Sequence, residues 1–124
     1  MKKTVMIKKN YEFQYFFKKG NYFSGKYLEI FIHKSSNDLN KLGIVVSKKV
    51  GKSVVRNSIK RLIRESYSKL EDNIDNCNMI ISWKKTVNIE NASYNNVLND
   101  LYYLFKKAKV LINEENINFI NKNI

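Results

Sequence analysis

The chain has 124 residues and a net charge of +12, from 23 lysines and arginines against 11 aspartates and glutamates. This length allows one domain with a modest core, and the 44% hydrophobic content excludes a disordered chain. No apolar run approaches the roughly 18 residues that cross a bilayer, and the N-terminus lacks the apolar core of a signal peptide. Cys77 is the single cysteine, which excludes a disulfide framework and a cysteine metal site. We therefore expect a basic, cytoplasmic domain that does not enter a membrane.

Residues 10–19 hold five aromatic side chains and are predicted to form a short helix. Asn10 is the expected N-cap, and Gly20 stands where a left-handed residue commonly ends a helix. Phe13 and Phe17 are four residues apart and therefore share one face of this helix. Five rings are more than one buried stripe needs, so two interpretations stay open for them. They pack in the core, or some of them stack on RNA bases in a groove.

Two β-strands are predicted next, over residues 27–33 and 41–47. In the first strand, apolar residues occupy every second position from Leu28 to Ile32, which indicates burial on one side only. Phe31 lies among polar residues on the opposite face, where a large ring suggests a covering helix or a ligand surface. The two strands are expected to pair as a hairpin.

The stretch from Ser47 to Tyr67 is the most basic part of the chain, with seven basic residues and no acidic one from Lys48 to Arg64. Its second half is predicted to be a helix, because apolar residues recur at helical spacing on one stripe. That stripe consists of Val55, Ile59, Leu62 and Ile63.

The opposite side of this helix repeats basic residues at intervals of four. Like charges at that spacing repel by a few tenths of a kcal/mol per pair, roughly, so such a row favours a polyanion as partner. A solvated cationic face, with Arg61 paired to Glu65, is the alternative. The candidate nucleic-acid contacts are Lys48, Lys49, Lys52, Arg56, Asn57, Lys60, Arg61 and Arg64.

The C-terminal part predicts one more strand, at residues 79–83, and a helix at residues 94–107 with Ser93 as its N-cap. Strand, basic helix and strand then form a parallel crossover unit, which in general is right-handed. Residues 111–124 are expected to be a tail, at most a frayed helix, so that the single domain spans residues 1–110.

No pattern of a catalytic or metal site borne by the protein is present. Gly51-Lys52-Ser53 resembles the end of a phosphate-binding loop, but Val46 stands where that motif needs its first glycine. His33 is the only histidine, and the acidic residues are scattered without pairs. The sequence therefore favours a binding module, with no catalytic residue and no metal ligand of its own.

Residues 43–65 strongly resemble the signature of the bacterial ribonuclease P protein component, and residues 7–20 resemble its first helix. The resemblance implies an α+β fold, a single-domain αββαβα sandwich of a small sheet with helices, like that of a ribosomal protein domain. It also implies a left-handed βαβ crossover. Two positions depart from the family pattern. Ser58 stands where an arginine is usual, and Lys84 follows Trp83 where an arginine is frequent.

The same resemblance implies a protein partner of a catalytic RNA that removes the 5′ leader from precursor tRNA. The RNA performs the chemistry with Mg²⁺, which it holds mainly itself. The basic residues named above are then implied to contact the catalytic RNA, and Phe13, Phe17 and Phe31 to line a groove for the single-stranded leader. Two alternatives stay open: a structural, ribosomal-type RNA-binding protein without a role in cleavage, and a DNA-binding helix module.

Overall fold

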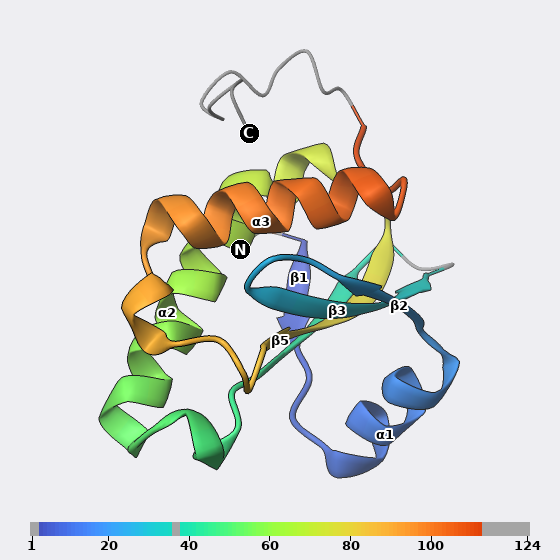
Figure 1. The fold of residues 1–124 in the computed structure, drawn as a ribbon. Helices are drawn as coiled ribbons and strands as arrows, with labels where there is room; N and C mark the ends of the chain where they lie inside the picture. Colours follow the sequence, from blue (N-terminus) through green and yellow to red (C-terminus); the bar gives the residue numbers. More distant parts are fainter. Residues whose placement is uncertain (1–2, 36–37, 113–124) are drawn as a thin grey trace.

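Figure 1 shows the computed structural model, which describes residues 3–35 and 38–112. Five strands form one mixed sheet in the order β1-β4-β5-β3-β2. The strands are β1 (Thr4–Met6), β2 (Asn21–Ser24), β3 (Leu28–Lys34), β4 (Asn40–Val45) and β5 (Cys77–Trp83). The helices are α1 (Asn10–Lys19), α2 (Ser53–Leu70) and α3 (Tyr94–Lys107), and the short 3₁₀ turns are η1 (Lys48–Val50), η2 (Glu71–Asn73) and η3 (Ile89–Asn91). The α+β class is confirmed.

The pairing of β3 and β4 differs from the expected hairpin, which is wrong. β5 lies between them, antiparallel to β3 and parallel to β4, so that Ile81 is paired with Ile30 on one side and Ile44 on the other. The physical reason is the composition of β5, which is apolar on both faces and therefore suits the centre of a sheet. The short strands β1 and β2, which the sequence patterns did not predict, pair at the two edges.

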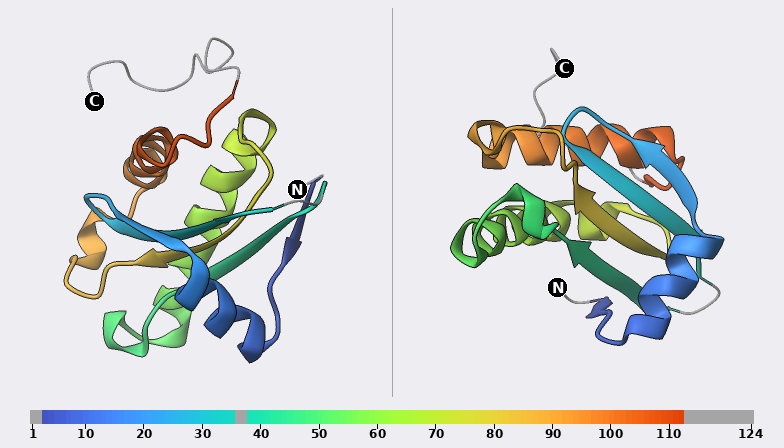
Figure 2. Two further views of the ribbon diagram at one scale, coloured as in Figure 1. Left: turned by 90° about the vertical axis from the view of Figure 1, so that its right-hand side faces the viewer. Right: turned by 60° about the horizontal axis from the view of Figure 1, so that its bottom comes forward.

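The unit β4-α2-β5 is the predicted parallel crossover. Its helix passes on the side of the sheet that also carries α3, and the connection has a left-handed sense (Figure 2). This is the hand that the family resemblance implies, and not the right hand that the general rule favours.

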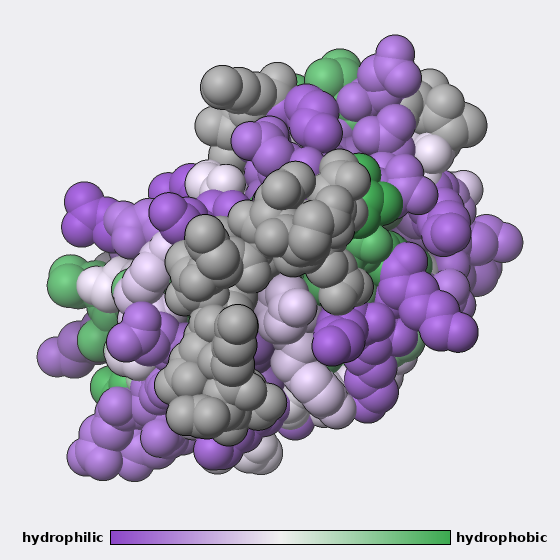
Figure 3. All heavy atoms as spheres, turned by 90° about the horizontal axis from the view of Figure 1, so that it is seen from above, coloured by the Kyte–Doolittle hydropathy of each residue, from purple (hydrophilic) through white to green (hydrophobic). Residues whose placement is uncertain are grey.

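The two faces of the sheet are covered unequally. α2 and α3 pack on one face, where the side chains of Ile30, Ile63 and Leu101 are fully buried in the main core. α1 covers only part of the other face, through a small cluster that Phe16 forms with Ile7 and Ile80. On the α3 side the molecule presents a largely hydrophilic surface (Figure 3). No helix among residues 3–35 and 38–112 is long and apolar enough to traverse a bilayer.

The two ends of α1 differ from the prediction. Lys9 and not Asn10 stands at the N-cap, and no side chain caps the first amides. Gly20 has φ −75°, so it is not a left-handed residue. A glycine fits here for another reason, because a Cβ atom would lie 2.6 Å from the carbonyl oxygen of Phe16.

Helix α3 agrees with its prediction in bounds, cap and buried face. Ser93 is the N-cap, and its hydroxyl accepts a hydrogen bond from the amide of Asn96 at 3.1 Å. The predicted apolar side chains are all buried: Val97, Leu98, Leu101, Leu104 and Phe105. Beyond the helix, Leu111 forms a β-bridge with Ile74. The expectation for the tail otherwise concerns residues 113–124, which lie outside the described residues.

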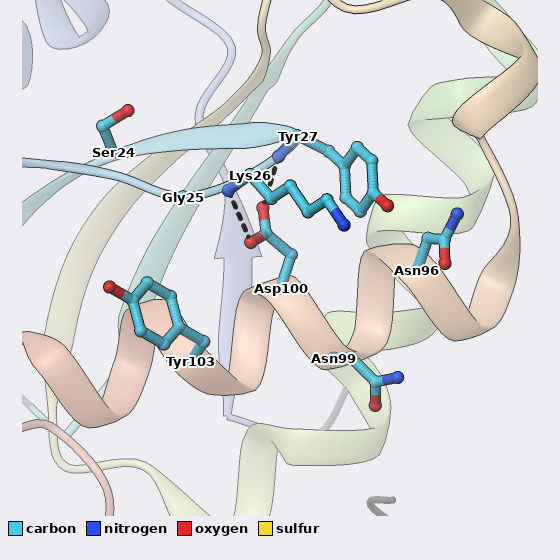
Figure 4. A pocket seen from close by; sticks show the side chains of 8 residues that line it. All are labelled: Ser24, Gly25, Lys26, Tyr27, Asn96, Asn99, Asp100 and Tyr103. Atoms are coloured by element: carbon cyan, nitrogen blue, oxygen red, sulfur yellow. Dashed lines mark hydrogen bonds between the residues drawn. The ribbon is translucent and has the colours of Figure 1, made fainter. Parts of the chain in front are cut away.

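Asp100 on α3 fixes the turn between β2 and β3 (Figure 4). Its carboxylate accepts hydrogen bonds from the amides of Lys26, Tyr27 and Leu28 at 2.8–2.9 Å. A Cβ atom on Gly25 would lie 2.6 Å from both carboxylate oxygens, so a glycine is needed for this close approach. A charged acceptor that satisfies three amides holds the β2-β3 hairpin against α3.

Candidate RNA interface

Helix α2 places its apolar stripe on the core and its basic side chains outward, as the spacing predicts. Ile59 and Ile63 are buried, while Val55 and Leu62 pack at the margin of the main core. The preceding turn η1 is capped by Ser47, whose hydroxyl accepts a hydrogen bond from the amide of Lys49. The lysines of this turn and of the helix start, Lys48, Lys49 and Lys52, are exposed.

Four of the predicted contact residues gather at one shallow depression on the outer face of α2. They are Asn57, Lys60, Arg61 and Arg64, and together with Ser58 they line a space of about 320 Å³. Arg56 lies apart from them, because its Nε donates a hydrogen bond to the carbonyl oxygen of Gly51 at 3.2 Å. The structure therefore divides the basic stretch into a helix-face group and a loop group.

Two interactions within this stretch decide which of its side chains are available to a ligand. Arg61 lies 4.0 Å from Glu65, but these side chains are 77% and 55% exposed, so the pair contributes little and leaves Arg61 available. The hydroxyl of Ser58 donates to the carbonyl oxygen of Val54 one turn earlier. Serine at this position therefore supplies neither the charge nor the reach of the arginine that the family resemblance leads us to expect.

A row of aromatic side chains lies between α1 and the uncovered part of the sheet. Its ring centroids are 6.5 Å apart for Phe13 and Phe17, 4.9 Å for Phe17 and Phe31, and 5.1 Å for Phe31 and Tyr22. Phe17 is 40% and Tyr22 51% exposed, and the other two are half-buried. The buried ring of α1 is Phe16 instead. We call Phe13, Phe17, Phe31 and Tyr22 the ring row.

Phe31 is on the partly exposed sheet face, as the alternation of its strand predicts. Tyr22 was missed, because it belongs to the unpredicted edge strand β2, where it pairs directly with Phe31. The adjacent aromatic pair Tyr22-Phe23 was the signal in the sequence that could have suggested a strand there. Near the start of β4, Nζ of Lys41 lies 2.7 Å from Oε2 of Glu12 on α1, and after the end of β4 the chain enters the basic segment, so this one strand connects the region of α1 with the start of α2 (Figure 1).

Two buried groups of the core, the Cys77 thiol and the Tyr67 hydroxyl, keep their protons near neutral pH. Burial raises the pKa of the Cys77 thiol to about 12, and burial likewise raises the pKa of Tyr67 to about 12. The His33 ring packs against Tyr15 and Phe16, with centroids 5.7 and 5.9 Å away. Nowhere in the described part of the chain do three His, Cys, Asp or Glu side chains gather in one group.

Comparison with known proteins decides the family. The ribonuclease P family model matches residues 1–109. The chain belongs to the ribonuclease P protein family. The ribonuclease P protein component of Fusobacterium nucleatum is 42% identical over 111 residues, which cover 85% of this chain and 97% of the relative. That of Clostridium kluyveri is 43% identical over 108 residues, 82% and 92% of the two chains.

Solved structures agree with this assignment. The ribonuclease P protein of Staphylococcus aureus matches with a TM-score of 0.76 and 33% identity, over 86% of this chain and 96% of the other. That of Thermotoga maritima matches with a TM-score of 0.74 and 26% identity, over 83% and 96%. This ribonuclease P protein therefore shares both the fold and the sequence pattern of its family, and the alternative of a DNA-binding helix module is set aside.

Proposed function

We propose that this ribonuclease P protein binds the catalytic RNA of ribonuclease P and the 5′ leader of precursor tRNA, and so assists removal of the leader. The catalytic groups and the Mg²⁺ ions belong to the RNA in this proposal, and the work is done in the cytoplasm. The observation that carries it is the ring row. Four partly exposed rings, each in contact with the next, suit unpaired nucleotides.

The basic stretch supports contact with a second, structured RNA. Arg61 and Arg64 are exposed at the α2 depression, with Lys60 half-buried beside them, and Lys48, Lys49 and Lys52 extend the positive charge along the loop. Such side chains neutralise phosphates irrespective of sequence and make binding dependent on salt. The two surfaces thus have different tasks: the basic stretch holds the catalytic RNA, and the ring row holds the leader.

The ring row explains how precursor is favoured over product. Precursor and mature tRNA differ by the leader, so a surface that binds only the leader raises affinity for the substrate alone. Stacking on an aromatic ring contributes about 1–3 kcal/mol per base and tolerates any base. We therefore expect Phe17→Ala to weaken binding of precursor tRNA to the holoenzyme roughly tenfold, as one lost stack predicts, and to leave mature tRNA unaffected.

Tyr15→Ala is the matched control for Phe17→Ala. Tyr15 is an aromatic residue of the same helix and is 49% exposed, but its ring lies against His33 and outside the ring row. Binding of both tRNAs to the holoenzyme, measured by filter retention, should be unchanged in Tyr15→Ala. Equal weakening of precursor and mature tRNA in Phe17→Ala contradicts the assignment of the ring row.

The basic stretch is tested by assembly with ribonuclease P RNA at several salt concentrations. Arg56→Ala or Arg64→Ala should weaken assembly and lower the slope of log affinity against log salt by about 1. Lys106→Ala, at the C-terminal end of α3, removes an exposed positive charge elsewhere and is the control. An equal loss in all three variants would show diffuse attraction without a defined contact.

A structural RNA-binding protein without a role in cleavage is distinguished by activity. Precursor tRNA is incubated with a bacterial ribonuclease P RNA at low Mg²⁺, with and without this protein. We expect cleavage to be stimulated by the protein. Binding of the RNA without stimulation would favour the structural alternative.

A further inference from the structure

Glu29 is an acidic side chain beside the ring row, and stacking alone does not explain it. It precedes Phe31 by two residues on β3 and therefore shares its face of the sheet. It is half-buried, opposite Ser24 on β2 and Ser82 on β5. Because a carboxylate repels phosphates, its position on this surface indicates contact with a part of the ligand other than the backbone.

The Glu29 carboxylate is held in place by the ring row itself. The hydroxyl of Tyr22 donates a hydrogen bond to Glu29 Oε2. This bond is the first cause of the raised pKa of Tyr22, ahead of burial and of the negative charge of Glu29. The pairing therefore joins a stacking ring and a fixed acceptor in one unit.

The carboxylate keeps further capacity to accept hydrogen bonds. Its two oxygens offer about four acceptor positions, of which Tyr22 occupies one. Within residues 3–35 and 38–112, no lysine or arginine forms an ion pair with it. Because the Tyr22 hydroxyl reaches this carboxylate, a base that stacked on the Tyr22 ring would lie close to Glu29, and a group that only accepts selects for a base edge that donates.

We infer that Glu29 makes the ring row selective for guanine at one leader position, an inference that rests on the proposed leader binding. Guanine presents two adjacent donors on its Watson–Crick edge, N1–H and N2–H, which match the two oxygens of a carboxylate. Adenine and cytosine present an amino donor beside an acceptor nitrogen, and uracil presents one N–H between two carbonyl oxygens. The expected order of preference is guanine, then adenine and cytosine, then uracil.

The test is competitive cleavage by the holoenzyme of precursor tRNA pools that carry each of the four nucleotides at a single leader position. At one position, kcat/KM for guanine should exceed that for uracil by roughly five- to tenfold, at the lower end of the discrimination of a bidentate contact with a base. Glu29→Gln keeps the shape of the side chain but replaces one acceptor by a donor, so this preference should disappear. Tyr22→Phe should reduce it, because the carboxylate loses the bond that orients it.

Glu90→Gln is the control for charge. Glu90 is an exposed residue of the η3 turn, and its replacement changes net charge by the same amount as Glu29→Gln. It should alter cleavage of all four pools equally. Circular dichroism and thermal melting establish that each variant is folded.

Two outcomes overturn the inference: no guanine preference at any leader position, or a preference that Glu29→Gln leaves unchanged. The second outcome assigns the preference to the RNA. If Phe17→Ala weakens binding of precursor tRNA and leaves mature tRNA unaffected, leader binding stands and only the base selectivity fails. If Phe17→Ala affects both tRNAs equally, the proposed function fails as well.

Discussion

The two faces of the sheet have the same alternating strands but different cover, and this difference separates stability from recognition. On β3, the side chains of Leu28, Ile30 and Ile32 point to the α2-α3 side and are buried. Phe31 points to the α1 side and stays half-exposed. The chain thus places rings on a surface that it does not cover. A large ring left partly in water adds little to the core and is available to a ligand.

Substitutions on opposite faces of β3 should have the largest effects, and they test the difference between the two faces most directly. Ile30→Ala removes a fully buried side chain and should lower the free energy of unfolding by about 2–5 kcal/mol. Phe31→Ala should lower it by roughly 1–2 kcal/mol, since part of the ring is already in water, but should weaken precursor binding. Urea denaturation and precursor binding measure the two effects. Similar losses of stability would show that the faces do not differ.

Asp100→Asn tests how the two faces are coupled. Asp100 is buried on the α3 side of the sheet and holds the hairpin that carries Tyr22 and Glu29 on the opposite face. An amide has one accepting oxygen, so its NH₂ group would face backbone N–H donors that the carboxylate now satisfies. We expect a loss of about 2 kcal/mol, measured by urea denaturation, with weaker precursor selection.

Asn99→Ala, at the neighbouring position of α3, is the control for Asp100→Asn. Like Asp100, it lines a pocket between α3 and the β2-β3 turn, and we expect a change within about 0.5 kcal/mol (Figure 4). A comparable loss in both variants would assign the effect to the helix surface rather than to the three amides.

The smallest expected effect is a loss of stability at alkaline pH, and it arises only from groups buried on the α2-α3 side of the sheet. Cys77 and Tyr67 have pKa values raised from 9.0 and 10.0 to about 12 by burial, so the unfolded chain loses these protons first. Stability is therefore complete well below pH 9 and falls as the pH rises toward 12, by about 0.5 kcal/mol at pH 9 and by more at pH 10. Urea unfolding at pH 8, 9 and 10 measures this. Cys77→Ala should flatten the dependence, and an unchanged slope would assign it to other groups.

Strong local patterns allowed correct predictions. Helix α3 has a serine cap and an uninterrupted apolar stripe, and its bounds are Tyr94–Lys107 as expected. The alternation from Leu28 to Ile32 placed Phe31 on the right face. In each case the period of apolar residues matches the geometry of one element, which needs no information from the rest of the chain.

Weak local patterns and pairings between distant parts of the chain did not allow correct predictions. β1 and β2 have three and four residues, too few to show a period, and their loss from the prediction also hid Tyr22. The hairpin expectation failed because β5, which begins about thirty residues after the end of β4, inserts between β3 and β4. Strand order depends on which surfaces meet on folding, and neighbouring strands in sequence are only the commonest solution.

By itself, the sequence determined the basic helix, the apolar stripe beneath it and a family resemblance that comparison confirmed. These are properties of spacing and charge, which are fixed along the chain. Only the tertiary structure decided that Arg56 turns to Gly51 while Lys60 and Arg64 gather, that four rings from three elements form one row, and that Asp100 and Glu29 both lie at the turn end of the same hairpin. Such groupings depend on contacts between residues far apart in sequence, because strand pairing and helix packing set the distances between their side chains.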